Sequence, residues 1–440
     1  MARRAARDRS VRPASPMTVT VRDPLWNNVR LEPLAVRLVD TPAFQRLRYV
    51  RQLGLAYLVY PGATHTRFEH ALGAYHLARQ SLALLDERGE LRGVPGDECA
   101  VVRAAALLHD VGHYPFSHAL EEIGALHHEE VARPLVTAGP LAAALAESFG
   151  AGAPERVYAL IRGQSDSPLQ RLISGSLDLD KIEYLKRDAF MCGVPYGEID
   201  VDRLINSLAV VDDPSTGRPA IGVREKGLSA LESLLFAKYQ MYRNVYWHHA
   251  VRSATAMYKR LVDAALRVGA LDAPLLAGYT DEGLLHRLDS AQPSPLLARL
   301  RERRLYKRAL ECPAAEFDES AAEWVASDHA LTTAAEDQLA RELGLAPGEI
   351  LLDYPAKTQM LGLDIPVLRR GGQVEQLTEA GLAGAINLPS LSQQLYRSAR
   401  WLRVFVADRA PLPESALLAL LQRPAEDVRR ALAAGDALLG

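Results

Sequence analysis

One stretch of the sequence concentrates side chains that could do chemistry. The apolar run at residues 104–108 leads directly into His109 and Asp110, and His113 and His118 follow closely. A neutral imidazole and a carboxylate both bind divalent metals, and this mixed nitrogen and oxygen character suits Fe, Mn, Co, Ni or Zn better than Ca. A metal with open coordination positions binds a phosphate oxygen and activates water. The stretch therefore predicts a hydrolytic metal site.

A His-Asp pair at a helix end is more often a cap or a surface pair than a pair of ligands. Two further stretches favour the metal site. His70 lies near the start of a second expected helix, and Asp178 and Asp180 lie at the start of a third. The helix before His109 is mostly Ala, Leu and Val in its second half, so an unpaired charge at its end would be costly. We expect three separated helices to converge on one ion.

Composition and charge narrow the class of protein. The 440 residues are 48% hydrophobic and 24% charged, with a formal net charge of −3. This near balance argues against a protein dedicated to nucleic acid, because phosphate neutralisation needs a basic excess. The three cysteines Cys99, Cys192 and Cys312 are widely spaced and odd in number, which fits a reducing cytoplasm. No apolar run approaches the ~20 residues of a membrane span, so we expect a cytoplasmic protein without a membrane partner.

Length and pattern predict two lobes after a short tail. Residues 1–17 are rich in arginine and lack the apolar segment of a secretory signal, so they are interpreted as a disordered basic tail. Residues 18–290 should form one mainly α domain with a short N-terminal β-hairpin. Residues 291–440 change in character and should form a smaller α+β C-terminal lobe.

The hydrophobic pattern also predicts the elements that position the site. Asp23-Pro24 should turn a hairpin near residues 18–31, and Asp40 is a candidate helix cap before Pro42. Helices are expected near 67–88, 97–110, 127–137, 141–149, 154–162, 179–191 and 227–268, and strands near 208–211, 219–223, 349–354, 365–374 and 401–406.

The sequence resembles the HD-domain phosphohydrolases. Within them it is similar to the deoxynucleoside triphosphate (dNTP) triphosphohydrolases, which carry a sterile-alpha-motif domain in animals and lack it in bacteria. The resemblance runs from about residue 21 to residue 261. It rests on four motifs in the same order, at residues 40–54, 67–70, 108–118 and 178–188. The HD-domain helical core is thus the expected fold of the larger domain.

The resemblance implies a metal-dependent hydrolase that cuts dNTPs to the deoxynucleoside and inorganic triphosphate, by attack of water at the α-phosphorus. It implies a cytoplasmic homo-oligomer, a dimer or tetramer. One divalent transition metal would be held by four residues, and Mg²⁺ would accompany the nucleotide. The implied metal ligands are His70, His109, Asp110 and Asp180, and the implied catalytic residues are His113, His118, His128 and Glu121.

A neutral-pH proton donor is required for the leaving 5′ oxygen, and His118 and His128 are the candidates, with Glu121 placed to orient one of them. Which histidine acts is left open. Three other histidines, His65, His127 and His249, are interpreted as satisfied structural imidazoles.

The substrate contacts follow from the same resemblance. Arg67 could fork onto phosphate oxygens, although a structural ion pair with Glu69 or Glu121 is the alternative. Lys238 and Tyr242 stand where animal members have arginine and histidine, and lysine cannot make the bidentate fork of arginine, so the triphosphate grip is expected to be looser. Aromatic residues at this spacing are otherwise more often core than ligand contacts. The expected contacts are Gln52 and Leu53 to base and sugar, Arg67, Lys181 and Lys238 to phosphate, Tyr184 and Asp188 to the sugar, and Tyr242 and Tyr246 beside Lys238.

Regulation is a further implication. Asp40, Gln45 and Arg48 match residues that read a guanine-nucleotide effector at a subunit interface in some relatives, and carboxylate and arginine suit the edges of guanine. The alternative for Asp40 is a helix cap. The alternatives to a dNTP triphosphohydrolase are an HD phosphodiesterase or nucleotidase on another phosphoester, and a nucleotide-sensing module that keeps the metal without turnover.

Overall fold

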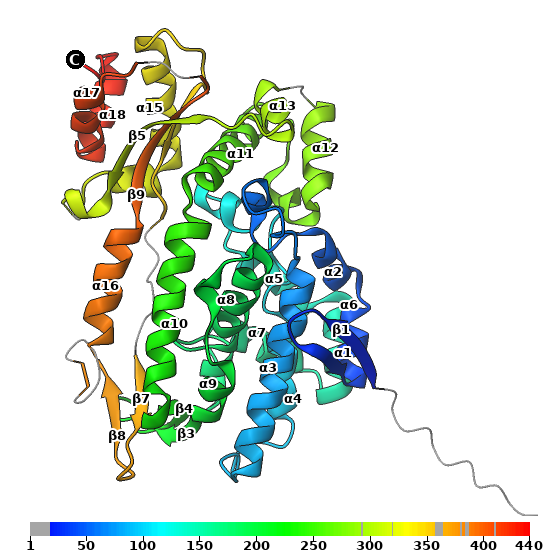
Figure 1. Cartoon of the computed structure of the whole chain (residues 1–440). Helices are drawn as coiled ribbons and strands as arrows, with labels where there is room; N and C mark the ends of the chain where they lie inside the picture. Colours follow the sequence, from blue (N-terminus) through cyan, green and yellow to red (C-terminus); the bar gives the residue numbers. More distant parts are fainter. Residues whose placement is uncertain are drawn as a thin grey trace, which may run out of the picture.

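The structure is a computed structural model that describes residues 18–291, 294–318, 320–356, 364–378, 381–382, 387–408 and 411–440. The expected basic tail at residues 1–17 lies outside this range. Within the described residues the fold is mainly helical, with three small sheets in the strand orders β1-β2, β3-β4-β7-β8 and β5-β9-β6. The expected class, a helical core with an N-terminal hairpin and an α+β C-terminal part, is confirmed (Figure 1).

The chain begins with the expected hairpin, in which β1 (Val19–Asp23) pairs with β2 (Asn27–Leu31). Two short helices follow, α1 (Pro33–Val39) and α2 (Pro42–Gln45). The N-cap of α2 is Thr41, whose hydroxyl oxygen accepts from the backbone N–H of Phe44, so the expected cap at Asp40 is wrong by one residue. Asp40 ends α1 instead.

Three helices build the frame of the site. Helices α3 (Arg67–Glu87) and α4 (Glu98–Leu108) pack together, and α8 (Leu179–Cys192) packs against α3. A capping box between Thr66 and Glu69 starts α3, which places His70 in its first turn. Gly73 lets α8 approach closely, because a Cβ there would lie 1.9 Å from Oε1 of Glu183. Between α4 and the strands β3 and β4, the described chain also forms the α-helices α5 (His128–Thr137), α6 (Gly139–Phe149), α7 (Ala153–Ile161) and α9 (Val201–Ser207).

The single long helix expected at residues 227–268 is wrong. The structure has α10 (Leu228–Met241), a π-helical turn at Tyr242–Tyr246, and α11 (His249–Arg267). A π-helical turn holds an extra residue and is frequent at functional sites. Here it carries Tyr242 and Tyr246, whose rings meet edge to face at 5.0 Å between centroids.

The C-terminal part has its own hydrophobic core around the β5-β9-β6 sheet. The strands are β5 (Lys307–Pro313), β6 (Ile350–Asp353) and β9 (Trp401–Val406). Helices α12 (Asp281–Ala291) and α13 (Pro295–Arg301) precede this sheet, and α14 (Glu323–Ser327), α15 (His329–Glu342), α17 (Glu414–Leu421) and α18 (Ala425–Ala434) complete this part of the described chain.

Part of the C-terminal sequence returns to the helical domain (Figure 1). Strand β7 (Ile365–Leu368) pairs in parallel with β4 (Pro219–Arg224), which itself pairs with β3 (Leu208–Asp212). The hairpin partner of β7 is β8 (Val374–Leu377), and α16 (Leu388–Ala399) packs against α10. The domain boundary near residue 290 stays a prediction. Among the described helices, none combines the length and the apolar composition that a membrane crossing requires.

Candidate metal centre and substrate pocket

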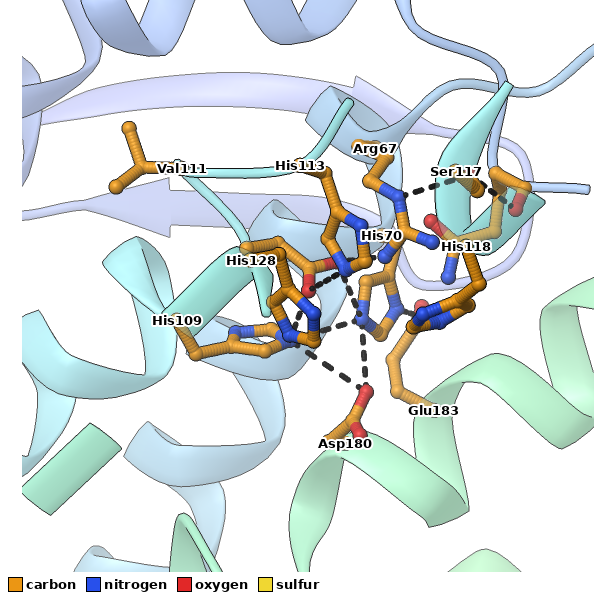
Figure 2. Close-up of polar contacts among 12 residues, drawn as sticks. Arg67, His70, His109, Val111, His113, Ser117, His118, His128, Asp180 and Glu183 are labelled. Atoms are coloured by element: carbon orange, nitrogen blue, oxygen red, sulfur yellow. Dashed lines mark hydrogen bonds and ion pairs between the residues drawn. The ribbon is translucent and has the colours of Figure 1, made fainter. Parts of the chain in front are cut away.

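Four donor atoms from three separate stretches converge where α3 and α8 begin and α4 ends. Nε2 of His70 lies 3.1 Å from Nε2 of His109, 3.5 Å from Oδ2 of Asp110 and 3.0 Å from Oδ1 of Asp180. Nε2 of His109 lies 3.4 Å from Oδ1 of Asp110 and 3.4 Å from Oδ1 of Asp180. Figure 2 shows both imidazoles directed at the Asp180 carboxylate. His70, His109 and Asp110 therefore form a group that could hold one metal ion, and Asp180 lies within 3.4 Å of both imidazole nitrogens.

Hydrogen bonds fix which nitrogen of each histidine faces this cluster. Nδ1 of His70 lies 2.6 Å from Oε2 of Glu183, and Nδ1 of His109 lies 2.9 Å from the carbonyl oxygen of Ala106. Because a carboxylate and a carbonyl accept, each Nδ1 carries the proton and each Nε2 presents a lone pair. Two imidazole Nε2 atoms and two carboxylates thus lie together, and each Nε2 can bind either a second proton or a metal ion. This donor set fits a divalent cation, whose charge would offset their repulsion.

The electrostatics of the cluster favour positive charge. Burial disfavours the charged form of His70, but hydrogen bonds to Asp180 and Glu183 outweigh burial and raise the pKa of His70 to about 10. Burial likewise opposes ionisation of Asp180, but His109 and His70 hold its pKa well below the ordinary value. The site therefore draws in a proton or a metal ion, and a metal would displace the proton.

Arg67 orients one of the carboxylates. Its Nη1 donates to Oδ2 of Asp110 at 2.6 Å, and its Nε donates to Oγ of Ser117 at 3.1 Å. Arg67 does not pair with Glu69 or Glu121, the two alternatives from the sequence. Glu69 closes the capping box of α3, and Glu121 bonds to histidines. Burial opposes the charge of Asp110, but Arg67 and the nearby histidines hold its pKa well below the ordinary value, so Asp110 stays ionised.

A second group of imidazoles lies next to the donor cluster. His113 stacks on His128 with ring centroids 3.7 Å apart, and Nε2 of His113 lies 3.1 Å from Oδ1 of Asp110. Glu121 bridges two histidines, at 3.2 Å from Nδ1 of His118 and 2.8 Å from Nδ1 of His128. Burial lowers the pKa of His128 to about 4, whereas the side chain of His118 is 59% exposed. The four predicted catalytic residues therefore form one connected set.

A cavity of about 780 Å³ opens beside these groups. Lys238 on α10 is buried at its wall, and burial together with Lys181 lowers the pKa of Lys238 to about 7. Lys181 donates from Nζ to Oδ2 of Asp178 at 2.5 Å and to the carbonyl of Gly175 at 3.0 Å. All nine residues predicted to contact substrate line the cavity, namely Gln52, Leu53, Arg67, Lys181, Tyr184, Asp188, Lys238, Tyr242 and Tyr246.

Asp188 is held rigidly at the wall of this cavity. Its Oδ2 accepts from the hydroxyl of Tyr246 at 2.7 Å, and its Oδ1 lies 2.8 Å from Nε2 of His65. His65 was expected to be only a core imidazole, yet it fixes a residue of the pocket. The sequence signal was its place five residues before His70, just ahead of the motif at residues 67–70.

Glu183 is a functional residue that the sequence reasoning did not assign. It is fully buried on α8 and accepts from Nδ1 of His70. Its position three residues after Asp180 puts both carboxylates on one face of α8, which is the signal that could have found it.

The three candidate effector residues lie outside the cavity: Asp40 caps the end of α1, Gln45 ends α2, and Arg48 lies in the 3-10 helix Arg46–Tyr49. Gln45 donates from Nε2 to the carbonyl of Val39 at 2.8 Å and accepts from Nε of Arg48 at 2.8 Å. The Arg48 guanidinium lies 3.5 Å from the ring centroid of Phe68. Asp40 is exposed at the end of α1. Their effector role stays a prediction.

Comparison with known families identifies the part of the chain that carries the site. Residues 67–187 match the HD domain model, and this range contains all four donors. The chain contains an HD domain. Residues 199–387 match the model described as the HD associated region, which spans the π-helical turn and reaches β7, β8 and the strand β6.

Relatives of this HD protein are found in archaea, bacteria and animals. An uncharacterized protein of Methanocaldococcus jannaschii is 37% identical over 290 residues, 66% of this chain and 59% of that protein. The deoxynucleoside triphosphate triphosphohydrolase SAMHD1 of Homo sapiens is 30% identical over 264 residues, 52% of this chain and 41% of that protein. The matches thus span about half the length of these curated relatives. A crystal structure of a hypothetical protein from Aquifex aeolicus is 29% identical, with a TM-score of 0.68 and coverage of 89% of this chain and 97% of that chain.

Proposed function

We propose that this HD protein is a metal-dependent phosphohydrolase that cleaves deoxynucleoside triphosphates to the deoxynucleoside and inorganic triphosphate. The observation that carries the proposal is the convergence of His70, His109, Asp110 and Asp180 beside a cavity of about 780 Å³. The similarity to human SAMHD1, a deoxynucleoside triphosphate triphosphohydrolase by name, supports the substrate.

The donor set points to a transition metal such as Fe, Mn, Co, Ni or Zn. A bound divalent cation supplies Lewis acidity to a phosphate oxygen and to water. Asp110 is kept ionised and oriented for this by Arg67, and His70 is kept in one tautomer by Glu183. The protein's own contribution is therefore a preorganised set of ligands.

Departure of the 5′ oxygen requires a proton, and we assign it to His118. Glu121 holds His118 at 3.2 Å, and the side chain of His118 is exposed to the solvent. His128 is less suited to donate, because burial lowers its pKa to about 4. His128 instead holds Glu121 in place at 2.8 Å.

The sugar and the phosphates contact different residues of the cavity lining in this proposal. Asp188, fixed by Tyr246 and His65, presents a carboxylate that can accept from a sugar hydroxyl. Lys238 and Lys181 approach the phosphates, and Mg²⁺ accompanies the nucleotide. Gln52 and Leu53, which line the same cavity, contact the base and sugar.

The charge balance of the cavity favours a second candidate, a phosphomonoester or diester with fewer negative charges. A triphosphate carries up to four negative charges, and the cavity wall is itself more acidic than basic. The lining has the carboxylates Asp110, Glu121, Glu122, Glu129, Asp178, Asp180 and Asp188 against the cations Arg67, Lys181, Lys238 and Arg252.

A product analysis distinguishes the two functions. Purified protein loaded with Mn²⁺ is incubated with each dNTP, each ribonucleotide, and mono- and diester controls, and the products are resolved by ion-exchange chromatography and ³¹P NMR. Inorganic triphosphate and deoxynucleoside are expected in equal amounts. Orthophosphate or pyrophosphate as the product, or turnover of the esters alone, would reject the dNTP triphosphohydrolase.

A further inference from the structure

The turn of the N-terminal hairpin reaches the residue that holds a metal ligand. Nε1 of Trp26 donates to Oε1 of Glu183 at 2.8 Å, and Nε of Arg187 donates to the same oxygen at 2.7 Å. The other oxygen of Glu183 accepts from Nδ1 of His70 at 2.6 Å. One carboxylate thus joins the hairpin, α8 and α3.

Hydrogen bonds and an ion pair of Asp23 stabilise the turn of the hairpin. Oδ1 of Asp23 accepts from the backbone N–H groups of Leu25 and Trp26, at 2.8 and 2.7 Å. Its Oδ2 makes an ion pair with Nη1 of Arg187 at 3.0 Å. Asp23, Glu183 and Arg187 are each at most 3% exposed. Burying a charged group is costly unless the group is paired. Each of these buried charges has a partner, so the hairpin, Arg187 and Glu183 form one connected unit.

We propose that the hairpin is a positioning element for the metal centre, which acts through Trp26, Asp23 and Arg187 on Glu183 and so on His70. This inference rests on the proposed metal centre. Trp26 and Arg187 saturate Oε1 of Glu183 and leave Oε2 for His70. The carboxylate then keeps the proton of His70 on Nδ1, and Nε2 keeps its lone pair for the cation.

The anchoring of Oε1 makes the amide variant Glu183→Gln informative. The amide oxygen must occupy the Oε1 position, because two N–H donors point at it. The amide NH₂ group then faces Nδ1 of His70, which has to accept and moves its proton to Nε2. His70 would present a proton to the cation site instead of a lone pair, although the variant is nearly the same size and shape.

The probe is Co²⁺ added to the metal-free full-length protein, with affinity measured by chelator competition and the visible absorption of bound Co²⁺ recorded. Glu183→Gln is expected to weaken Co²⁺ binding about 10- to 100-fold, which is the usual effect of losing a residue that orients a histidine ligand. Trp26→Phe removes one N–H donor and keeps an aromatic ring, so it is expected to weaken binding less and to shift the same absorption band in the same direction. Asp23→Asn should act in the same direction.

The matched control is Asn28→Ala on the exposed side of the same hairpin, which loses only a bond from Arg22. It should bind Co²⁺ like the parent. If the parent binds Co²⁺ and Glu183→Gln and Trp26→Phe bind it equally well with unchanged spectra, the positioning role is wrong. If parent and Asp180→Ala bind alike, the metal centre itself is wrong. The melting temperature of each metal-free variant separates loss of folding from loss of affinity.

Discussion

Two buried charge clusters in this protein are completed in different ways. In the cluster around His70, two imidazole nitrogens and two carboxylates face one another at 3.0 to 3.5 Å. In the cluster around Arg252, the guanidinium meets Glu122 through two bonds of 2.9 Å and Asp353 at 2.6 to 3.2 Å. Lys259 adds a bond to Glu122 at 2.8 Å. In the second cluster the two cationic and two acidic side chains balance in charge and pair with one another. In the first cluster the hydrogen-bond acceptors outnumber the donors.

The difference separates a binding site from a structural joint. The Arg252 cluster links α11, the segment after α4 and strand β6, and nothing further is needed for its charges. The His70 cluster instead draws in a proton or a metal ion, because hydrogen bonds to Asp180 and Glu183 outweigh burial and raise the pKa of His70 to about 10. Charge alone therefore does not mark a functional site, but an excess of acceptors over donors among buried groups does.

The largest effect is expected at the cluster with excess acceptors. Asp180→Ala should abolish both metal binding and phosphohydrolysis, because it removes an ionised ligand. The variant also removes a hydrogen-bond partner of the buried His70, so the free energy of unfolding of the metal-free protein should fall by about 1–3 kcal/mol. Metal analysis, product assays and urea denaturation measure the three effects. Parent-like hydrolysis by this variant would remove Asp180 from the site.

At the Arg252 cluster we expect a loss of stability without a loss of metal binding. Arg252→Met leaves Glu122 and Asp353 buried without their main partner, so the free energy of unfolding should fall by about 3–5 kcal/mol. Metal affinity of the folded fraction should stay near that of the parent. Denaturant titration and metal binding are measured on the same samples. A loss of metal affinity without loss of stability would erase the distinction between the clusters.

Glu336 on α15 is a buried carboxylate that belongs to neither cluster. Its Oε1 accepts from the N–H of Leu352 at 2.8 Å, but burial outweighs the nearby Arg260 and raises the pKa of Glu336 from 4.5 to about 7. Folding therefore favours the protonated form, and stability from this group is lost as the pH rises from about 4.5 to 7.

Glu336→Gln tests this sign. The parent should lose up to about 3 kcal/mol relative to the variant between pH 4.5 and pH 8, since each pKa unit corresponds to about 1.4 kcal/mol. The free energies of unfolding of both proteins across this pH range are the measurement. A constant difference between them would mean that Glu336 keeps an ordinary pKa.

Much of the helical framework followed from sequence periodicity. Helices α3, α4, α5 and α8 end within a few residues of their predicted limits, because apolar stripes and caps are local signals. The break after Met241 was not predictable, since no glycine or proline marks the π-helical turn at Tyr242–Tyr246. The parallel pairing of β4 with β7 joins residues more than a hundred positions apart, and no local pattern encodes it.

The candidate site, like the helical framework, could be predicted in part from the sequence. The four donors and the cavity-lining residues were named because four motifs of the chain resemble those of the HD-domain phosphohydrolases, and helical spacing places several of them on one face. The supporting partners were missed, since Glu183 and His65 act through hydrogen bonds across helices. The partner of Arg67 was also missed, because only the folded chain brings Asp110 beside it.

The smallest effect is expected at Asp188, which has two partners. Tyr246→Phe removes one hydrogen bond and leaves His65, so stability should fall by about 1 kcal/mol. If Asp188 contacts the sugar, KM for dNTP should rise more than kcat falls, because the carboxylate becomes less fixed. Steady-state kinetics and thermal unfolding measure both. An unchanged KM would place the sugar elsewhere in the cavity.

The most direct test is the anomalous diffraction of a crystal equilibrated with Mn²⁺. One strong peak is expected between Nε2 of His70, Nε2 of His109 and the carboxylates of Asp110 and Asp180, at the roughly 2.0–2.2 Å typical of nitrogen and oxygen ligands. A peak held instead by His113, His118, Glu121 and His128, or no ordered peak, would contradict the proposed metal centre.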